Sequence, residues 1–278
     1  MNKFPCVLVA EISVINTLKL AVNGLSKHSD VSRIDIIVPD NQIDDFRIVF
    51  SNMDVRVINE SELISIENIN KIKSELGLMS HRTGWYLQQF LKWEYAKYID
   101  EPFYLIWDAD TVLLKEYMFF NKNSPVFNLA KEYHKPYFLT IEKLIKIKKQ
   151  IKSSFISQYM VIDVSLLNNL TEEISKANSE KIDWYLTVIK LLDKNNPSEF
   201  SEYETYGNYI MTLQHSSPPT LNRDKWFRYG SEILNPTVDT SLDELKKSFK
   251  GYQYVAFERH SSSFLKYISA HALRFFRV

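Results

Sequence analysis

The sequence has few cysteines, few glycines and no excess of either charge. Cys6 is its single cysteine, so no disulfide can form within the chain, which fits a reducing compartment. Its six glycines are too few for glycine-rich repeats. Basic and acidic residues number 34 each, and the resulting zero net charge gives no indication of a nucleic acid as partner.

Long apolar runs are absent as well. No window of about 18 residues is apolar throughout, so the sequence predicts no transmembrane helix. The first apolar run, residues 4–10, is too short for a signal peptide and ends at Glu11. We therefore expect a cytoplasmic protein. With 45% apolar and 24% charged residues, the 278-residue chain has the composition of a globular enzyme.

The first half of the chain alternates between strand and helix signals. Short apolar runs predict strands at residues 4–10, 33–38, 54–58 and 103–107. Helical patterns are found at residues 16–27 and 83–98. This alternation predicts an α/β fold with a mostly parallel sheet covered by helices on both faces. In such sheets ligands bind beyond the carboxyl ends of the strands.

The second half is less regular. We expect a lysine-rich helix at residues 140–152, a strand at 157–164, and loops at 195–197 and 216–219. No linker long enough to divide the chain is present. We therefore expect a single compact domain over residues 1–278.

The strongest chemical signal is Asp108-Ala109-Asp110, which directly follows the strand predicted at 103–107. At the end of a strand the chain turns, so both carboxylates can converge on one divalent ion. Carboxylate oxygens suit Mg²⁺ or Mn²⁺, and these ions can bridge a diphosphate. The alternative is a pair of solvated acids that begin a turn.

The same triplet also fits the phosphatases of the haloacid-dehalogenase superfamily, with Asp108 as nucleophile and Asp110 as acid/base. That superfamily normally has the motif on its first strand and an acidic pair later in the chain. Here three predicted strands precede the triplet, and the one adjacent Asp pair, residues 44–45, lies upstream. The order of the elements therefore disfavours a phosphatase.

The helix expected at 83–98 has two unlike faces. Leu87, Leu91 and Tyr98 lie on one stripe. The opposite face combines an aromatic ring with polar groups: Trp85, Gln88, Gln89 and Lys92. This face, or the Arg82 end of the helix, could bind a nucleotide, a pyrophosphate or a sugar. The alternative is a surface helix with Trp85 packed under a loop.

Two further segments carry ionisable groups. Glu202 and Glu204 lie among aromatic residues, and either could take a proton from an acceptor hydroxyl as a general base. They could equally be acids favoured at the start of a helix. His260 follows an apolar run and could ligate a metal, although a lone histidine more often has a structural role.

Together these segments resemble a known family. The similar runs are Arg82–Lys92, Trp107–Asp110, Ser154–Ser157 and Ser201–Gly207. They resemble DUF6492, a group of bacterial proteins regarded as glycosyltransferase-like and often encoded among genes for surface polysaccharide. The resemblance implies a GT-A-like fold and a hexosyltransferase-type enzyme, with a nucleotide-binding half at residues 1–113 and an acceptor-binding half with a C-terminal tail at 114–278.

The resemblance also implies roles for the candidate residues. Asp110 would ligate Mn²⁺ or Mg²⁺, Asp108 would contact the ribose or reach the metal through water, and His260 matches a late metal ligand. Arg82 and Lys92 would offset the charge of the nucleotide-sugar diphosphate. Glu204, rather than Glu202, would be the base of an inverting displacement. If configuration is retained, both glutamates would simply bind the acceptor.

The acceptor implied by the resemblance is a glycan or a lipid-linked glycan. The tail at residues 264–278, taken as a helix, has basic and apolar sides that could rest on the cytoplasmic face of an inner membrane, or the tail could be a docking helix.

Two other functions fit the sequence less well. A nucleotidyltransferase should have a glycine-rich loop after the first strand, and none is present. A non-catalytic carbohydrate-binding protein would explain the aromatic residues but not the acid pair.

Overall fold

The computed structural model describes residues 3–214 and 218–258. His260 and the tail at 264–278 lie outside this part of the chain, as does part of the loop expected at 216–219. The internal contacts of the described residues group into two compact units: residues 3–13, 30–108 and 118–223 form unit 1, and residues 14–29, 109–117 and 224–258 form unit 2. The expected single domain with halves meeting at residue 113 stays a prediction.

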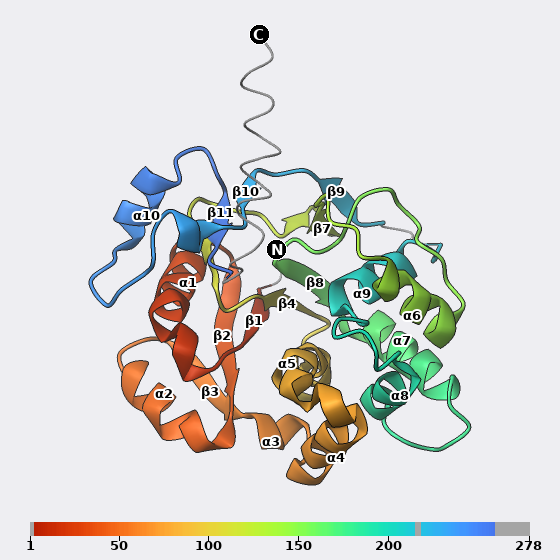
Figure 1. The fold of residues 1–278 in the computed structure, drawn as a ribbon. Coiled ribbons are helices and arrows are strands. Elements are labelled where there is room, and N and C mark those ends of the chain that lie inside the picture. Colours follow the sequence, from red (N-terminus) through yellow and green to blue (C-terminus); the bar gives the residue numbers. More distant parts are fainter. Residues whose placement is uncertain (1–2, 215–217, 259–278) are drawn as a thin grey trace. The chain divides into compact units, whose positions relative to one another are not determined.

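Unit 1 is built on a sheet of five strands (Figure 1). Their order is β3 (Val55–Asn59), β2 (Val31–Val38), β1 (Phe4–Val9), β4 (Phe103–Trp107) and β8 (Tyr159–Asp163). β1 pairs in parallel with β2 and with β4, β2 pairs in parallel with β3, and β8 runs antiparallel to β4. The predicted strands and the mostly parallel sheet are thus confirmed.

The central residues of these strands are mainly apolar, and they have no access to water. Cys6, Leu8, Ile36 and Leu105 are all 0% exposed. Strands covered on both faces are expected to be continuous apolar runs rather than alternating ones. This burial explains why the sheet could be predicted from short apolar runs.

Helices account for most of the rest of unit 1. They are α2 (Ile43–Val49), α3 (Glu60–Leu63), α4 (Ile66–Leu76), α5 (Thr83–Glu94), α6 (Lys135–Ile145), α7 (Val164–Lys176), α8 (Trp184–Leu191) and α9 (Glu202–Ile210). The helix predicted at 83–98 is α5 followed by the 3₁₀ turn η4 (Tyr95–Tyr98). A small sheet joins β7 (Ser124–Asn128) to β6 (Phe120–Asn121) and β9 (Thr220–Asn222).

The prediction of a lysine-rich helix at 140–152 is wrong in its bounds. α6 begins at Lys135, with a proline in its first turn, and ends at Ile145. Lys146 has a φ of 58° in the left-handed region, a conformation that ends a helix. The lysines beyond Ile145 therefore belong to a loop.

Unit 2 contains α1 (Ile15–His28), α10 (Leu242–Ser248) and a sheet of β10 (Trp226–Phe227), β11 (Tyr254–Ala256) and β5 (Thr111–Leu113). A cluster of buried apolar side chains forms its core: Leu20, Val112, Leu114, Phe227, Leu245, Phe249, Val255 and Phe257. α1 lies close to β5: a Cβ added to Gly24 would stand 2.5 Å from the Leu113 carbonyl oxygen.

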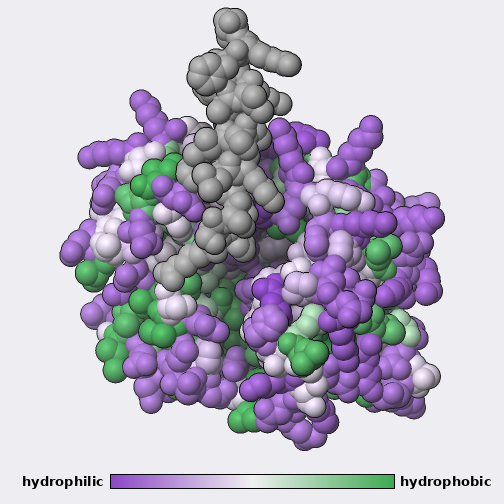
Figure 2. Space-filling view, viewed as in Figure 1, coloured by the Kyte–Doolittle hydropathy of each residue, from purple (hydrophilic) through white to green (hydrophobic). Residues whose placement is uncertain are grey.

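The face of the described chain that Figure 2 shows is mainly polar. On the face drawn in Figure 2, hydrophilic side chains dominate and hydrophobic ones form small separate groups. Exposed apolar residues such as Ile48, Leu78 and Val238 are scattered along the sequence. No helix within residues 3–214 and 218–258 has the length and apolar character needed to cross a membrane.

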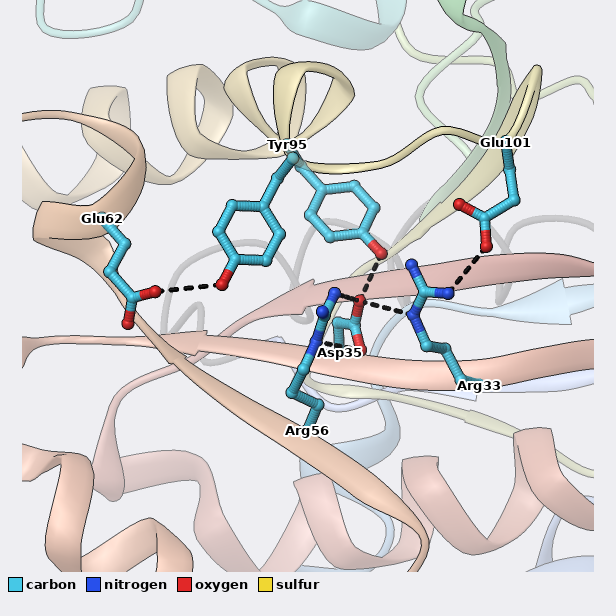
Figure 3. A network of polar contacts seen from close by, with 7 residues as sticks. Arg33, Asp35, Arg56, Glu62, Tyr95 and Glu101 are labelled. Atoms are coloured by element: carbon cyan, nitrogen blue, oxygen red, sulfur yellow. Dashed lines mark hydrogen bonds and ion pairs between the residues drawn. The ribbon is translucent and has the colours of Figure 1, made fainter.

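A buried carboxylate holds β2, β3 and η4 together (Figure 3). Asp35, on β2, is 0% exposed and accepts hydrogen bonds from the Arg33 Nε at 3.1 Å, the Arg56 Nε at 3.1 Å and the Tyr95 hydroxyl. Arg33 also donates to Glu101 at 2.7 Å. Burial, followed by the charge of Asp35, raises the pKa of Tyr95, so its phenol remains a donor. This network compensates a charge that would otherwise be costly to bury.

Replacing Asp35 by Asn should destabilise the protein. The change removes the charge that both arginines and Tyr95 contact, so we expect a loss of about 2–4 kcal/mol in the free energy of unfolding. Urea unfolding followed by circular dichroism measures it. Glu62→Gln is the matched control, because Glu62 is exposed and accepts from Tyr98, and its loss should stay within about 0.5 kcal/mol. Equal losses for the two variants would contradict the role of Asp35.

α9 approaches the segment before β8 closely enough to require a glycine. A Cβ on Gly207 would stand 2.3 Å from the Phe155 ring, and Phe155 is 0% exposed. The enclosed ring has no room to move away. Gly207 therefore sets the distance between α9 and the Ser154–Ser157 segment.

We expect Gly207→Ala to lower the free energy of unfolding by about 1–3 kcal/mol through overpacking. Gly84→Ala tests the same chemical change in α5, where the nearest atom to the new Cβ is Glu11 Oε1 at 3.6 Å, an ordinary contact. It should leave stability unchanged or raise it by up to about 0.5 kcal/mol. Thermal unfolding of both variants checks the contrast, and a stable Gly207→Ala protein would rule out the close approach.

Candidate active site

Asp108 lies at the point in the sheet where the order of the strands reverses. It directly follows β4, whose neighbour β1 leads on the other side to β2 and β3. Such a reversal of strand order creates a crevice at the carboxyl ends of the strands, where ligands bind in α/β proteins. The Asp108 N–H donates to the Gln158 carbonyl at 2.9 Å, and Gln158 is buried with a φ of 72°. Residues held in this sparsely populated region are often found at functional sites.

The Asp108 side chain joins a buried ion cluster. Lys92, in the last turn of α5, has a side chain that is 3% exposed. Its Nζ donates to Asp108 Oδ1 at 2.5 Å and to Glu202 Oε1 at 2.8 Å. The Tyr203 hydroxyl donates to the same Asp108 Oδ1 at 2.7 Å. Side chains from α5, α9 and the end of β4 thus meet at one ammonium group.

The charges of this cluster support one another. Burial alone would lower the pKa of Lys92, but the adjacent Asp108 and Glu202 carboxylates raise it above its usual value. For Glu202, burial raises the pKa, the Lys92 charge opposes this shift, and the Asp108 charge adds to it. The ammonium therefore keeps its proton, and the cluster combines one cation with two acidic groups.

The polar face of α5 is turned toward α9 rather than toward water. Gln89 is 2% exposed, and its Oε1 accepts from the Glu202 N–H at 3.1 Å. Its Nε2 donates to the Trp85 carbonyl at 3.0 Å. The surface-helix interpretation is therefore wrong for Gln89 and Lys92, although Gln88 is only half-buried. The binding roles predicted for these side chains stay predictions.

The start of α5 is attached to the loop before α9. Arg82 donates from Nε to the Pro197 carbonyl at 3.0 Å and from Nη2 to the Ser198 hydroxyl at 3.1 Å. Its guanidinium lies 4.3 Å from the centre of the Trp85 ring, a cation–π distance. Trp85 thus lies against Arg82, which is itself bound to the loop.

The two glutamates of α9 have different surroundings. Both stand in the first turn, after Ser201, whose hydroxyl accepts from the Glu204 N–H. Glu202 joins the Lys92 cluster. Glu204 is 1% exposed and accepts from the Ser154 hydroxyl at 2.6 Å and from Asn208 Nδ2 at 3.1 Å. Burial raises the pKa of Glu204, against the opposing effects of Ser154 and Lys149.

Sequence reasoning missed Tyr203, Gln158 and Ser154 as members or neighbours of this site. Tyr203 and Ser154 lie within segments that were noted for their family resemblance, which was the available signal. Nothing in the sequence indicates the positive φ of Gln158, because glutamine has no preference for that region.

Asp110 belongs to unit 2. Its carbonyl accepts from the Phe257 N–H at 2.8 Å, and its Oδ1 accepts from the Thr111 hydroxyl at 3.3 Å. In the part of the chain that the structure describes, no group of three or more His, Cys, Asp or Glu residues could hold a metal ion. Asp110 has the oxygen chemistry that Mn²⁺ or Mg²⁺ prefers. Asp108 Oδ1 fits such an ion poorly, because an ammonium and a phenol already donate to it.

Three solved structures that are similar to this chain are glycosyltransferases. Mouse xyloside xylosyltransferase 1, in its apo form, has a TM-score of 0.50 and 10% identity, with 94% of this chain and 99% of that chain covered. The LgtC galactosyltransferase in complex with donor and acceptor sugar analogs has a TM-score of 0.46 and 9% identity, with 99% and 97% covered. The bifunctional glycosyltransferase WbbM, in its apo structure, has a TM-score of 0.44 and 10% identity, with 93% and 46% covered.

The first of these likenesses confirms the predicted GT-A-like α/β fold, a mostly parallel sheet flanked by helices. At such low identity it shows the fold alone. Among curated proteins no sequence match is found. A family model described as a family of unknown function, DUF6492, matches residues 10–228, and the chain belongs to this family.

Proposed function

We propose that this protein is a glycosyltransferase that moves a sugar from a nucleotide-sugar donor to a glycan or a lipid-linked glycan. The observation that carries the proposal is the placement of Asp108, fixed by Lys92 and Tyr203, at the switch point of a GT-A-like sheet. A role in bacterial surface polysaccharide synthesis follows from the family resemblance. We also retain a cytoplasmic location with membrane contact through residues 264–278, which lie outside the described part of the chain.

The donor would bind beyond the carboxyl ends of β1 and β4. The Asp108 side chain is 20% exposed, so one side of this otherwise buried cluster is accessible to a ligand. A carboxylate held by two donors is well oriented to accept a hydrogen bond from a ribose hydroxyl. Arg82, which is half-buried and already paired with the Ser198 loop, would add positive charge near the diphosphate.

Asp110 is the residue we propose for holding Mn²⁺ or Mg²⁺, with His260 as a further predicted ligand outside the described residues. When bound, the ion would offset negative charge on the leaving nucleoside diphosphate. The chain's own groups would orient the donor, and the fixed ammonium of Lys92 would keep Asp108 in one position.

In an inverting reaction the acceptor hydroxyl oxygen attacks the anomeric carbon, the bond to the diphosphate oxygen breaks, and a carboxylate takes the hydroxyl proton. Glu204 stays our candidate for that base. Its raised pKa suits a base, because a carboxylate with a higher proton affinity accepts a proton more readily. Its 1% exposure means that the acceptor has to enter the α9 and Ser154 surroundings to reach it. In a retaining reaction both glutamates would instead support the acceptor site.

Asp110→Ala should abolish metal-dependent nucleotide binding. A thermal-shift screen of nucleoside diphosphates with and without Mn²⁺ measures this, and the wild type should gain stability with its nucleotide when metal is present. Asp44→Ala, at a surface carboxylate paired with Arg47, is the control and should behave as the wild type.

If no nucleoside diphosphate stabilises the wild-type protein in the presence of Mn²⁺, the transferase proposal fails. Release of phosphate from simple phosphomonoesters would revive the phosphatase alternative, with Asp108 as nucleophile.

Glu204→Gln should keep donor binding and lose sugar transfer by about 10²–10⁴-fold, the usual contribution of a general base. Donor binding is followed by thermal shift and transfer by release of the nucleoside diphosphate. Glu202→Gln removes the other acid of the same helical turn and serves as the comparison. Wild-type turnover in Glu204→Gln would eliminate Glu204 as the base.

A further inference from the structure

Lys92 supplies a cation at the carboxylate that an Asp-x-Asp motif would offer to a metal. Its Nζ lies 2.5 Å from Asp108 Oδ1, a close ion pair. The Asp108 side chain is 20% exposed, whereas that of Lys92 is 3% exposed. The cation therefore approaches Asp108 from inside the protein, and its position does not depend on a ligand.

The ammonium is held from several directions. Glu202 Oε1 accepts from it at 2.8 Å, and the Tyr203 ring centre lies 5.0 Å from Nζ. Glu202 is itself fixed through its N–H, which donates to Gln89 one turn earlier on α5. Because the Lys92 side chain is 3% exposed and its ammonium is bound to two carboxylates, contact with a phosphate would require both ion pairs to break. The structure thus offers little support for a direct diphosphate contact by this lysine.

We propose that Lys92 is a positioning residue that acts as the built-in counter-cation of Asp108, so that Asp108 binds no divalent metal and serves as a fixed hydrogen-bond acceptor. A divalent ion beside Asp108 would meet the ammonium as a like charge at short range, and the nearer oxygen is already used by two donors. The identity of the hydroxyl that Asp108 accepts from, a donor ribose or sugar, rests on the proposed function. The claim that Asp108 binds no divalent metal does not rest on the proposed function.

The test removes the ammonium without leaving a buried charge unpaired. Lys92→Met alone would strand Glu202, whose side chain is 6% exposed, so the variant is Lys92→Met with Glu202→Gln. Mn²⁺ binding is titrated by electron paramagnetic resonance with no nucleotide present. We expect this double variant to bind Mn²⁺ at least about fivefold more tightly than the wild type, because the repulsion at Asp108 is gone.

Adding Asp108→Asn to the double variant should return Mn²⁺ binding to the wild-type level. A gain smaller than about fivefold, or a gain that survives in this triple variant, overturns the proposal. Circular dichroism and thermal unfolding confirm that each variant is folded.

A second comparison needs only single substitutions. In an otherwise wild-type chain, Asp108→Asn should change Mn²⁺ affinity by less than about twofold, since Asp108 is not a ligand. A loss as large as that caused by Asp110→Ala would overturn the proposal, even if the double variant did not fold. Because none of these titrations uses a sugar nucleotide, their outcome is independent of whether the protein is a glycosyltransferase.

If the protein is a glycosyltransferase, Lys92→Arg provides a functional readout. Arginine keeps the charge but changes the geometry at Asp108. A positioning role predicts that this variant raises KM for the donor more than it lowers kcat, with thermal stability kept close to that of the wild type. Equal kcat and KM in wild type and Lys92→Arg would contradict the positioning role of Lys92.

Discussion

The ammonium of Lys92 is the interaction on which the site depends. It joins the last turn of α5, the end of β4 and the first turn of α9, which are separated by up to 110 residues along the chain. Burying a charge is unfavourable, and it is tolerated here because both neighbouring carboxylates compensate it. The same contact that stabilises the packing of α9 therefore also determines where Asp108 points. Stability and site geometry depend on the same ion pairs in this part of the protein.

The Asp35 and Lys92 ion clusters of unit 1 differ in which of their charged groups is exposed to solvent. Asp35 is matched by the positive charges of Arg33 and Arg56, so its carboxylate is fully engaged inside the sheet. Lys92 faces two acids, one of which is partly exposed. In the first cluster the carboxylate is the buried group and its arginines are the partly exposed ones, so the carboxylate serves only to fix strands to η4. In the second cluster the ammonium is the buried group and the Asp108 carboxylate is partly exposed, which is the arrangement that our proposed ligand-binding role requires.

The sheet could be predicted from the sequence because its strands are mostly buried and therefore largely apolar, as at Cys6 and Leu105. The environment of Lys92 could not be predicted from the sequence. A helix face with Gln89 and Lys92 has the composition of a solvated surface, and its burial depends on Glu202, which folds back from far along the chain. The end of α6 was missed for a local reason, since a lysine gives no sign that it will adopt the left-handed conformation found at Lys146. Asp108 was found because the end of a strand is visible in the sequence. Lys92 and Glu202 were also singled out, but the ion pairs that bring them together beside Asp108 were not expected.

Cys6 has a practical consequence. It is the one cysteine of the chain, lies at 0% exposure within β1, and burial together with the nearby Asp35 charge raises the pKa of its thiol. The thiolate is the form of cysteine that attacks thiol reagents, so a protonated and enclosed sulfur is inert. The natural sequence is therefore already a suitable background for spin or fluorophore labelling. A single cysteine introduced at an exposed position such as Leu78, which is 100% exposed beside the start of α5, would take up the probe selectively while the native thiol stays untouched.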